Sequence, residues 1–187
     1  EIAKQGYNAD LNHIDVSNIK DLSKLFEGSK FCGDISKWDV SNVENMHGMF
    51  SHSCFNGDIS NWNVSKVTTM RYMFSYCKLF NQDLSGWDVS NVKYMGEMFW
   101  SAFSFNGDVS TWDVRNVENM SCMFSYSAFN RNLKRWNPKR VKDMSSMFCG
   151  CEAFNSDISR WDVSNVTDMG RMFNGCPCPE EYQPKFK

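Results

Sequence analysis

Hydrophobic residues recur along this chain with a period of 24 or 25 residues. Each period contains a tryptophan, then a V-x-x-M-x-x-M-F stretch, then a second phenylalanine seven residues before the next tryptophan. The tryptophans of the pattern lie at positions 38, 62, 87, 112, 136 and 161. A degenerate first copy has Ile14 in the tryptophan position and Phe26 in the phenylalanine position, which makes seven copies. Self-similarity of this period predicts a repeat protein whose copies stack on one another.

The spacing within a copy is strict except at one point. Seven residues always separate the second phenylalanine from the tryptophan, and twelve separate the tryptophan from the next phenylalanine. Between the two phenylalanine columns, four residues intervene in some copies and five in others. Fixed spacings predict columns of stacked side chains, and the single variable site predicts a connector at the surface.

Each copy is predicted to form one strand and one short helix. The V-x-x-M-x-x-M-F stretch that begins at Val43 has the i, i+3, i+6, i+7 spacing of a helical stripe, and Ser41 with Glu44 has the spacing of a capping box. The I-x-x-W-x-V stretch that begins at Ile35 matches the strand of a leucine-rich repeat. The predicted fold class is therefore an α/β repeat solenoid, a leucine-rich-repeat-like stack of seven 24–25-residue units with one parallel β-sheet and short helices.

The repeat sets the expected domain organisation. Residues 14–176 are predicted to form one solenoid without internal boundaries. Residues 1–13 and 177–187 depart from the motif, and Pro177, Pro179 and Pro184 interrupt the last copy. These segments are expected to be N-terminal and C-terminal caps or tails.

Composition and charge exclude several classes of protein. The 20 basic and 22 acidic residues give a net charge of −2, which argues against a nucleic-acid binder. No apolar run reaches the roughly 18 residues that a membrane span needs, and no signal-peptide pattern follows Glu1. The common nucleotide-binding, hydrolase and metalloprotease motifs do not occur, so the chain is not expected to be an enzyme or to need a cofactor.

Polar residues recur in columns as well. The chemistry of the two aspartate columns allows three roles, namely turn capping, Ca²⁺ ligation and glycosidase catalysis. Turn capping is favoured, because an active site needs a unique constellation and these carboxylates recur from copy to copy. An asparagine column is expected to be structural, with buried side-chain amides that bond one another and the turn backbone. The aspartate columns are Asp34, Asp58, Asp83, Asp108 and Asp157, and Asp15, Asp39, Asp88, Asp113 and Asp162. The asparagine column is Asn56, Asn81, Asn106, Asn130 and Asn155, with Cys32 in its first position.

The eight cysteines do not follow a disulfide-scaffold pattern. Cys77, Cys151 and Cys176 occupy a column of small residues, which predicts buried free thiols. Two alternatives remain open. One is a disulfide between Cys151 and Cys176 of adjacent copies, and the other is zinc binding by Cys149 with Cys151 or by Cys176 with Cys178. No metal is therefore assigned from the sequence.

The repeat carries a family resemblance. W-D-V-S-N-V-x-x-M-x-x-M-F followed by F-N-x-D-[IL]-S resembles the BspA-like, leucine-rich-repeat-related repeats of bacterial surface proteins, also described as DUF285. The resemblance covers residues 14–176 and is clearest at 38–50, 87–99 and 161–173, whereas N-P-K-R replaces D-V-S-N at 137–140. It implies a cell-surface or extracellular protein that acts in adhesion or protein binding, and it supplies no catalytic residues.

Partner recognition is expected at positions that the repeat leaves variable. Aromatic side chains on the connectors suit a protein or a sugar ring, although they could instead pack into a private cluster. These residues are His52, Tyr76, Trp100, Phe103 and Tyr126. Six basic residues within twelve positions suit an acidic partner or anionic glycan, or else form a solvated face. They are Arg131, Lys134, Arg135, Lys139, Arg140 and Lys142.

The sequence therefore predicts a non-catalytic, adhesion-type binding module at the cell surface. Its expected partner is a protein or a glycan, with no nucleic acid. The alternative is a structural subunit of a larger assembly, such as a virion or envelope complex. A glycan-active enzyme is a third class, which would depend on the aspartate columns.

Overall fold

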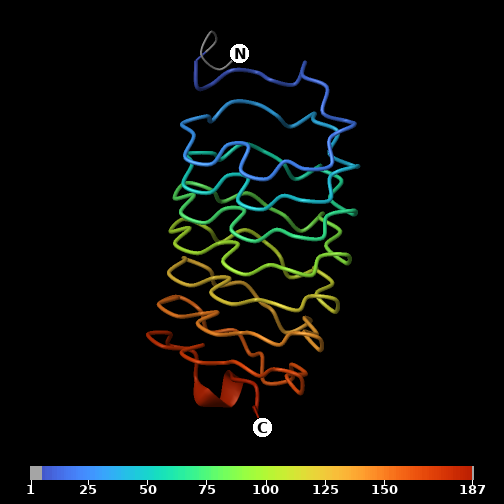
Figure 1. The fold of residues 1–187 in the computed structure, drawn as a ribbon. Coiled ribbons are helices and arrows are strands. Elements are labelled where there is room, and N and C mark those ends of the chain that lie inside the picture. Colours follow the sequence, from blue (N-terminus) through green and yellow to red (C-terminus); the bar gives the residue numbers. More distant parts are fainter. Residues whose placement is uncertain (1–5, 187) are drawn as a thin grey trace.

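The computed structural model describes residues 6–186 and shows the repeats as a stack of chain turns. Successive turns follow one another from the N-terminal to the C-terminal end of the stack (Figure 1). The one helix among the described residues is the short 3₁₀ helix η1, Glu180–Tyr182, at the C-terminal end. No described helix is long and apolar enough to cross a membrane.

The predicted parallel β-sheet and short helices are wrong. Apart from η1, the described residues form no regular element, and the fold is mostly irregular. Neighbouring turns do pair in parallel, but each pairing is an isolated bridge of a single residue. These bridges join Asp10 to Asp34, Asp21 to Asn45, Asn45 to Thr69, Thr69 to Tyr94, Tyr94 to Asn119, Asn119 to Asp143, and Asp143 to Asp168.

The V-x-x-M-x-x-M-F stretch forms consecutive tight turns instead of a helix. The N–H of Met49 donates to the C=O of Met46 three residues earlier, at 3.3 Å. Between these turn bonds, the N–H groups of Gly48 and Phe50 donate to the next copy, at 2.8 and 2.9 Å. An α-helix would direct these donors to carbonyls four residues earlier in the same segment. Here, the donors alternate between the local turn and the neighbouring copy.

Left-handed backbone prevents this stretch from becoming helical. Every copy has two positions with φ between 52° and 71°, a conformation that costs L-residues about 1–2 kcal/mol and that an α-helix does not contain. Turns with a left-handed residue in the third position also return side chains to the same side every three residues, so the i, i+3 pattern fits them too. The first column is Lys24, Gly48, Tyr72, Glu97, Cys122, Ser146 and Arg171, and the second is Gly28, His52, Tyr76, Ser101, Tyr126, Gly150 and Gly175.

Local turns also replace the predicted strand at 35–40. The N–H of Trp38 donates to the C=O of Ile35 at 3.1 Å, and the N–H of Ser36 donates to the carboxylate of Asp34 at 2.8 Å. A strand would direct such donors to a neighbouring strand. Because the local turns use these donors, only isolated bridges form between the copies.

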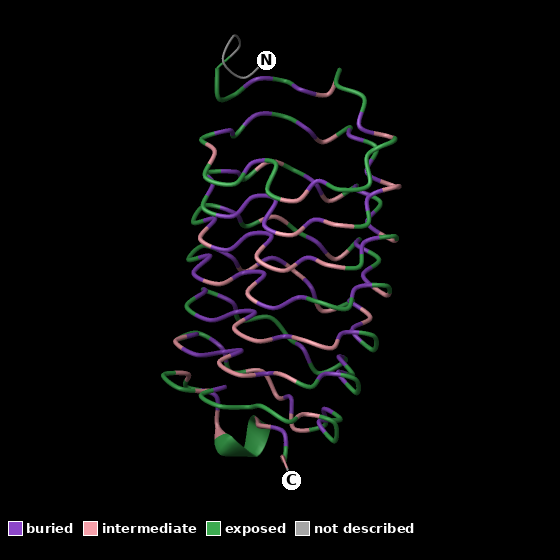
Figure 2. Ribbon diagram, in the orientation of Figure 1, coloured by how far each residue is buried: buried purple, intermediate pink, exposed green. Residues whose placement is uncertain are grey.

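Columns of aromatic rings form the core. Rings of the first phenylalanine column stack between neighbouring copies with centroids 5.5–5.8 Å apart. Within a copy, the two phenylalanines lie 3.7–4.7 Å apart, which joins the two columns. Buried segments recur in every turn, and exposed residues gather at the corners and at the two ends of the stack (Figure 2). The predicted stacking of columns is thus correct.

The tryptophan column connects each copy to the preceding one by hydrogen bonds. Every tryptophan of the column donates its indole N–H to a backbone carbonyl of the preceding copy, at 2.9–3.2 Å. The rings themselves are almost fully buried. Tryptophan therefore supplies both apolar volume and a donor for a buried carbonyl, whereas leucine has no such donor.

The pairing reaches into both predicted caps. Cys32 donates to the C=O of Tyr7 at 2.8 Å, and Ile158 donates to the C=O of Tyr182 at 2.9 Å. Phe186 is partly buried against the core. Residues 1–5 and 187 of the two caps lie outside the described residues. The described parts of both caps thus contact the neighbouring turns.

Replacing Ser146 with glycine tests whether this position has a left-handed backbone. Ser146 has φ of 54°, and Gly48 occupies the same column in the second copy. We expect Ser146→Gly to leave the free energy of unfolding unchanged or raise it by up to about 1 kcal/mol, because the relieved strain offsets the entropic cost of glycine. In a helix the same change would cost roughly 0.5 kcal/mol, since glycine is a poorer helix former than serine. Urea denaturation measures whether the free energy of unfolding rises or falls. Ser145→Gly, one residue earlier and outside the left-handed columns, is the control and should destabilise.

Candidate functional site

The five predicted aromatic residues lie along one edge of the stack, at the variable connectors. We call His52, Tyr76, Trp100, Phe103 and Tyr126 the aromatic strip. The rings of His52 and Tyr76 stack at 4.5 Å, and Tyr76 meets Trp100 edge-on at 4.9 Å. These three residues pack against one another, as the private-cluster alternative expects. Phe103 and Tyr126 are 53% and 51% exposed.

Phe103 and Tyr126 border a hollow of about 390 Å³. Glu152 forms part of its wall, and Ser127, Ala128 and Gly150 also line it. The variable connector length explains this hollow. The copies that carry Phe103 and Glu152 have five connector residues, whereas the copy between them has four. The shorter connector leaves a gap between its two neighbours.

The backbone holds Tyr126 against the copy that follows. Tyr126 has φ of 54°, so the left-handed turn sets the direction of its side chain. A Cβ atom at Gly150 would clash with the Tyr126 ring, so glycine permits this close approach. The Tyr126 hydroxyl lies 4.0 Å from the Cys149 sulfur, a contact that raises the pKa of Tyr126. Tyr126 is therefore positioned beside the hollow by two left-handed residues.

A second hollow lies at the other end of the strip. His52 and Tyr76 line it together with Lys78 and Leu79, and its volume is about 470 Å³. Lys78 Nζ also lies 6.0 Å from the centroid of the Phe103 ring. Sequence reasoning missed Lys78, Leu79 and Glu152 as neighbours of the strip. The signal that identifies them is their place in the connectors, where the copies differ in length.

The six predicted basic residues do not meet at one place. Arg135 lines a hollow with Asp113 and Arg115, and Arg140 and Lys142 line another with Glu118. Several of them lie close enough to aspartates of the repeat to help lower their pKa values: Arg131 for Asp108, Lys134 for Asp157, and Lys139 for Asp113. Arg131 also donates to the C=O of Asn106 at 2.7 Å. Their positive charge is thus distributed among neighbouring carboxylates.

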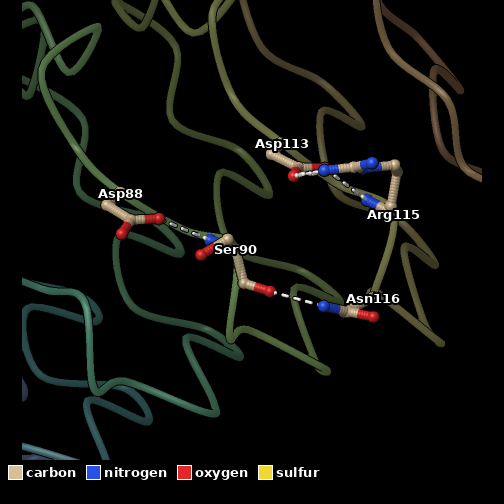
Figure 3. Close-up of polar contacts among 5 residues, drawn as sticks. All are labelled: Asp88, Ser90, Asp113, Arg115 and Asn116. Carbon is tan, nitrogen blue, oxygen red and sulfur yellow. Dashed lines mark hydrogen bonds and ion pairs between the residues drawn. The ribbon is translucent and has the colours of Figure 1, made fainter.

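The aspartate columns cap turns, as predicted. Asp88 accepts the N–H of Ser90 at 3.0 Å, and Asn116 of the next copy donates its amide to the C=O of Ser90 at 2.8 Å (Figure 3). Arg115, which replaces the serine in its copy, makes the same backbone bond to Asp113 and adds its guanidinium (Figure 3). The turn needs only a backbone N–H two residues after the aspartate, which corrects the predicted role of Ser41 as a helix cap.

These turn bonds also lower the pKa values of several carboxylates. Hydrogen bonds from the residue two positions later hold the pKa of several aspartates below the ordinary value, since they favour the charged form. The affected residues are Asp15, Asp21, Asp34, Asp39, Asp58, Asp108, Asp113 and Asp157. Among residues 6–186, no three His, Cys, Asp or Glu side chains gather in a way that could hold a metal ion.

The asparagine column forms a ladder of bonds to the backbone, as predicted, but the predicted burial of its amides is wrong because most of its members are exposed. Asn56 accepts the backbone N–H of Asn81 at 3.0 Å, and Asn81 accepts that of Asn106 at 2.8 Å. The ladder continues through Asn130 to Asn155. These residues connect one copy to the next and are therefore structural.

The cysteines are free thiols in the described structure. Burial raises the pKa of Cys77 to about 11 and that of Cys151 to about 12. Their sulfur atoms lie 3.2 Å from the carbonyl oxygens of Phe55 and Phe129 in the preceding copy. Cys176 is only partly buried but contacts the carbonyl of Phe154 in the same way, at 3.5 Å. Two of the three cysteines are thus buried as predicted, and Cys151 and Cys176 are both free thiols in this structure.

Comparison with known proteins places this repeat in a family. No curated protein and no solved structure matches the chain. Residues 2–102 and 83–183 each match the family described as "Mycoplasma protein of unknown function, DUF285". Because the two matches together cover nearly the whole chain, this protein belongs to the DUF285 family.

Proposed function

We propose that this protein is a non-catalytic binding module that recognises a protein or glycan partner through the aromatic strip. The observation that carries the proposal is the exposed pair Phe103 and Tyr126 beside a hollow that also contains Glu152. Exposed aromatic side chains that line a concavity are typical anchors for a partner. The aromatic residues of the repeat columns, by contrast, pack in the core.

The chemistry of the hollow suits a ring or a cation. An aromatic face packs against the C–H surface of a sugar or against a Lys or Arg side chain of a protein. The Glu152 carboxylate accepts hydrogen bonds from sugar hydroxyls or pairs with a cationic group. The aspartate columns, by contrast, are engaged in turn bonds, which supports a binding role over catalysis.

The BspA-like resemblance supports a location at the cell surface or outside the cell. The W-D-V-S-N-V-x-x-M-x-x-M-F motif carries that resemblance, and we extend it to an adhesion-type role for this chain. The extension concerns location and role only, because the strand of a leucine-rich repeat is not formed here.

A binding assay with matched variants tests the proposal. The test variant combines Phe103→Ser with Tyr126→Asn, since asparagine tolerates the left-handed backbone of position 126. The control is Tyr94→Ser, which removes an exposed aromatic ring outside the strip. The chain, fluorescently labelled, is applied to a glycan array and to a panel of immobilised extracellular-matrix proteins.

We expect the wild type and the control to bind the same target. The double variant should bind at least about tenfold more weakly, because two anchor rings have been removed. Equal binding by the double variant would contradict the proposal, and so would a wild type that binds none of the glycans or proteins.

A further inference from the structure

The fourth position of the connectors forms a row along the edge that carries the aromatic strip. In four successive copies this position holds Lys78, Phe103, Ala128 and Glu152. We call these four residues the connector row. A basic side chain therefore begins the row, an aromatic ring follows it, and an acidic side chain ends it.

Each end of the connector row belongs to one of the two hollows of the aromatic strip. Lys78 lines the hollow of about 470 Å³, and the described residues of that lining include no acidic side chain. Glu152 lines the hollow of about 390 Å³ and is the one charged residue among the described residues there. Both side chains are exposed, and none of the ion pairs among residues 6–186 involves either of them. The two hollows thus present opposite charges to a partner.

The hollow at Glu152 offers few polar side chains. The Ser127 hydroxyl is buried and donates to the C=O of Phe124 at 2.7 Å. The Tyr126 hydroxyl contacts the Cys149 sulfur at 4.0 Å. The Glu152 carboxylate is the remaining polar side chain, since the rest of the lining is phenylalanine, alanine and glycine. A cationic side chain needs only an aromatic face and a carboxylate, whereas a sugar needs several hydrogen bonds to its hydroxyls.

The Phe103 ring lies between the two charges and remains accessible. Lys78 Nζ lies 6.0 Å from its centroid, within the range of a cation–π contact. The ring is nevertheless about half exposed. An apolar side chain of a partner can therefore pack on Phe103 while a neighbouring acidic group pairs with Lys78.

We infer that an extended protein segment lies along the connector row, with a Lys or Arg side chain in the hollow at Glu152 and an Asp or Glu side chain beside Lys78. This inference rests on the proposed function and specifies the partner as a protein instead of a glycan. A protein segment supplies both charges and an apolar residue between them, so its charges complement those of the row.

The stacking of the copies sets the distance between the two charges of the partner. From Phe74 to Phe148, the rings of the first phenylalanine column are separated by three steps of 5.6–5.8 Å, so the ends of the connector row lie about 17 Å apart. An extended chain advances about 3.3 Å per residue, so about five residues cover this distance. A helix advances about 1.5 Å per residue and needs about eleven residues.

Selection from a phage-displayed library of random twelve-residue peptides tests this inference. Peptides enriched on the immobilised wild-type chain should carry one basic and one acidic residue. These residues should lie about four to six positions apart, with an apolar residue between them. The affinity of the enriched peptides should fall as the salt concentration rises, since salt screens exposed charge pairs.

Reversing one charge at a time tests the role of each end of the row. Glu152→Lys should select peptides with two acidic residues, and Lys78→Glu should select peptides with two basic residues. Each variant should bind the wild-type peptides at least about tenfold more weakly, because like charges then face each other. The matched controls are Glu181→Lys in η1 and Lys37→Glu beside Trp38, which reverse exposed charges outside the connectors. Both controls should select the same peptides as the wild type.

Three results would overturn the inference: no enriched peptide, enriched peptides without the paired charges, or charge reversals that leave the selection unchanged. A separation of about eleven residues would contradict the extended conformation. The proposed function fails separately, if the double variant Phe103→Ser, Tyr126→Asn binds every wild-type ligand as well as the wild type does. Glycan binding that this double variant loses, without any enriched peptide, would overturn the inference and leave the proposed function intact.

Discussion

Replacing Phe99 with alanine should lower the free energy of unfolding by about 3–5 kcal/mol. Phe99 is fully buried in the middle of the stack. Its ring lies 3.7 Å from that of Phe105 in the same copy, and 5.6 and 5.7 Å from those of Phe74 and Phe124 in the neighbouring copies. Alanine would leave a cavity that interrupts the column in both directions. Rigid neighbouring columns cannot close this cavity without losing their own contacts.

Phe103 provides the control for this prediction, because it lies only four residues later and is mostly exposed. We expect Phe103→Ala to change stability by no more than about 0.5 kcal/mol. Urea denaturation followed by tryptophan fluorescence measures both variants. Similar losses for the two would show that the phenylalanine column does not carry the stability of the stack.

Replacing Trp112 with phenylalanine should lower the free energy of unfolding by about 1–3 kcal/mol, although the side chain stays aromatic. The indole N–H of Trp112 donates to the C=O of Leu84 at 2.9 Å in a buried environment. Phenylalanine cannot donate, so this carbonyl would lose its partner without access to water. The smaller phenylalanine ring also fills less of the core, which lowers the free energy of unfolding further.

Trp100→Phe is the matched control, since Trp100 lies on a connector outside the tryptophan column. We expect the control to lose clearly less stability than Trp112→Phe in thermal and urea denaturation. If Trp112→Phe is as stable as the wild type, the indole hydrogen bond does not contribute to the cohesion between copies.

The sequence alone indicates which side chains share a column. Constant spacing of Trp, Met and Phe requires that equivalent residues meet, whatever the backbone does between them. For this reason the stacking, the buried cysteine column, the asparagine ladder and the turn-capping role of aspartates could all be predicted. The aromatic strip was found in the same way, because residues such as Trp100 and Phe103 fall outside the columns.

The backbone conformation could not be predicted in this way. The spacing of Val43, Met46, Met49 and Phe50 fits a helix, but it fits consecutive turns with a left-handed residue equally well. Among residues 6–186, ten non-glycine residues adopt positive φ. Their identities, such as Lys24 and Glu97, carry no local signal for that conformation. It is stabilised by the local turn bonds together with the hydrogen bonds to the neighbouring copies.

The sequence by itself therefore determined the repeat, the members of each column and the residues that fall outside the columns. The tertiary structure alone decided that these columns are joined by tight turns and single bridges instead of helices and a sheet. The physical reason lies in the backbone donors, which bond alternately within the turn and to the next copy. That choice depends on having a neighbouring copy on each side, and no single copy contains this information.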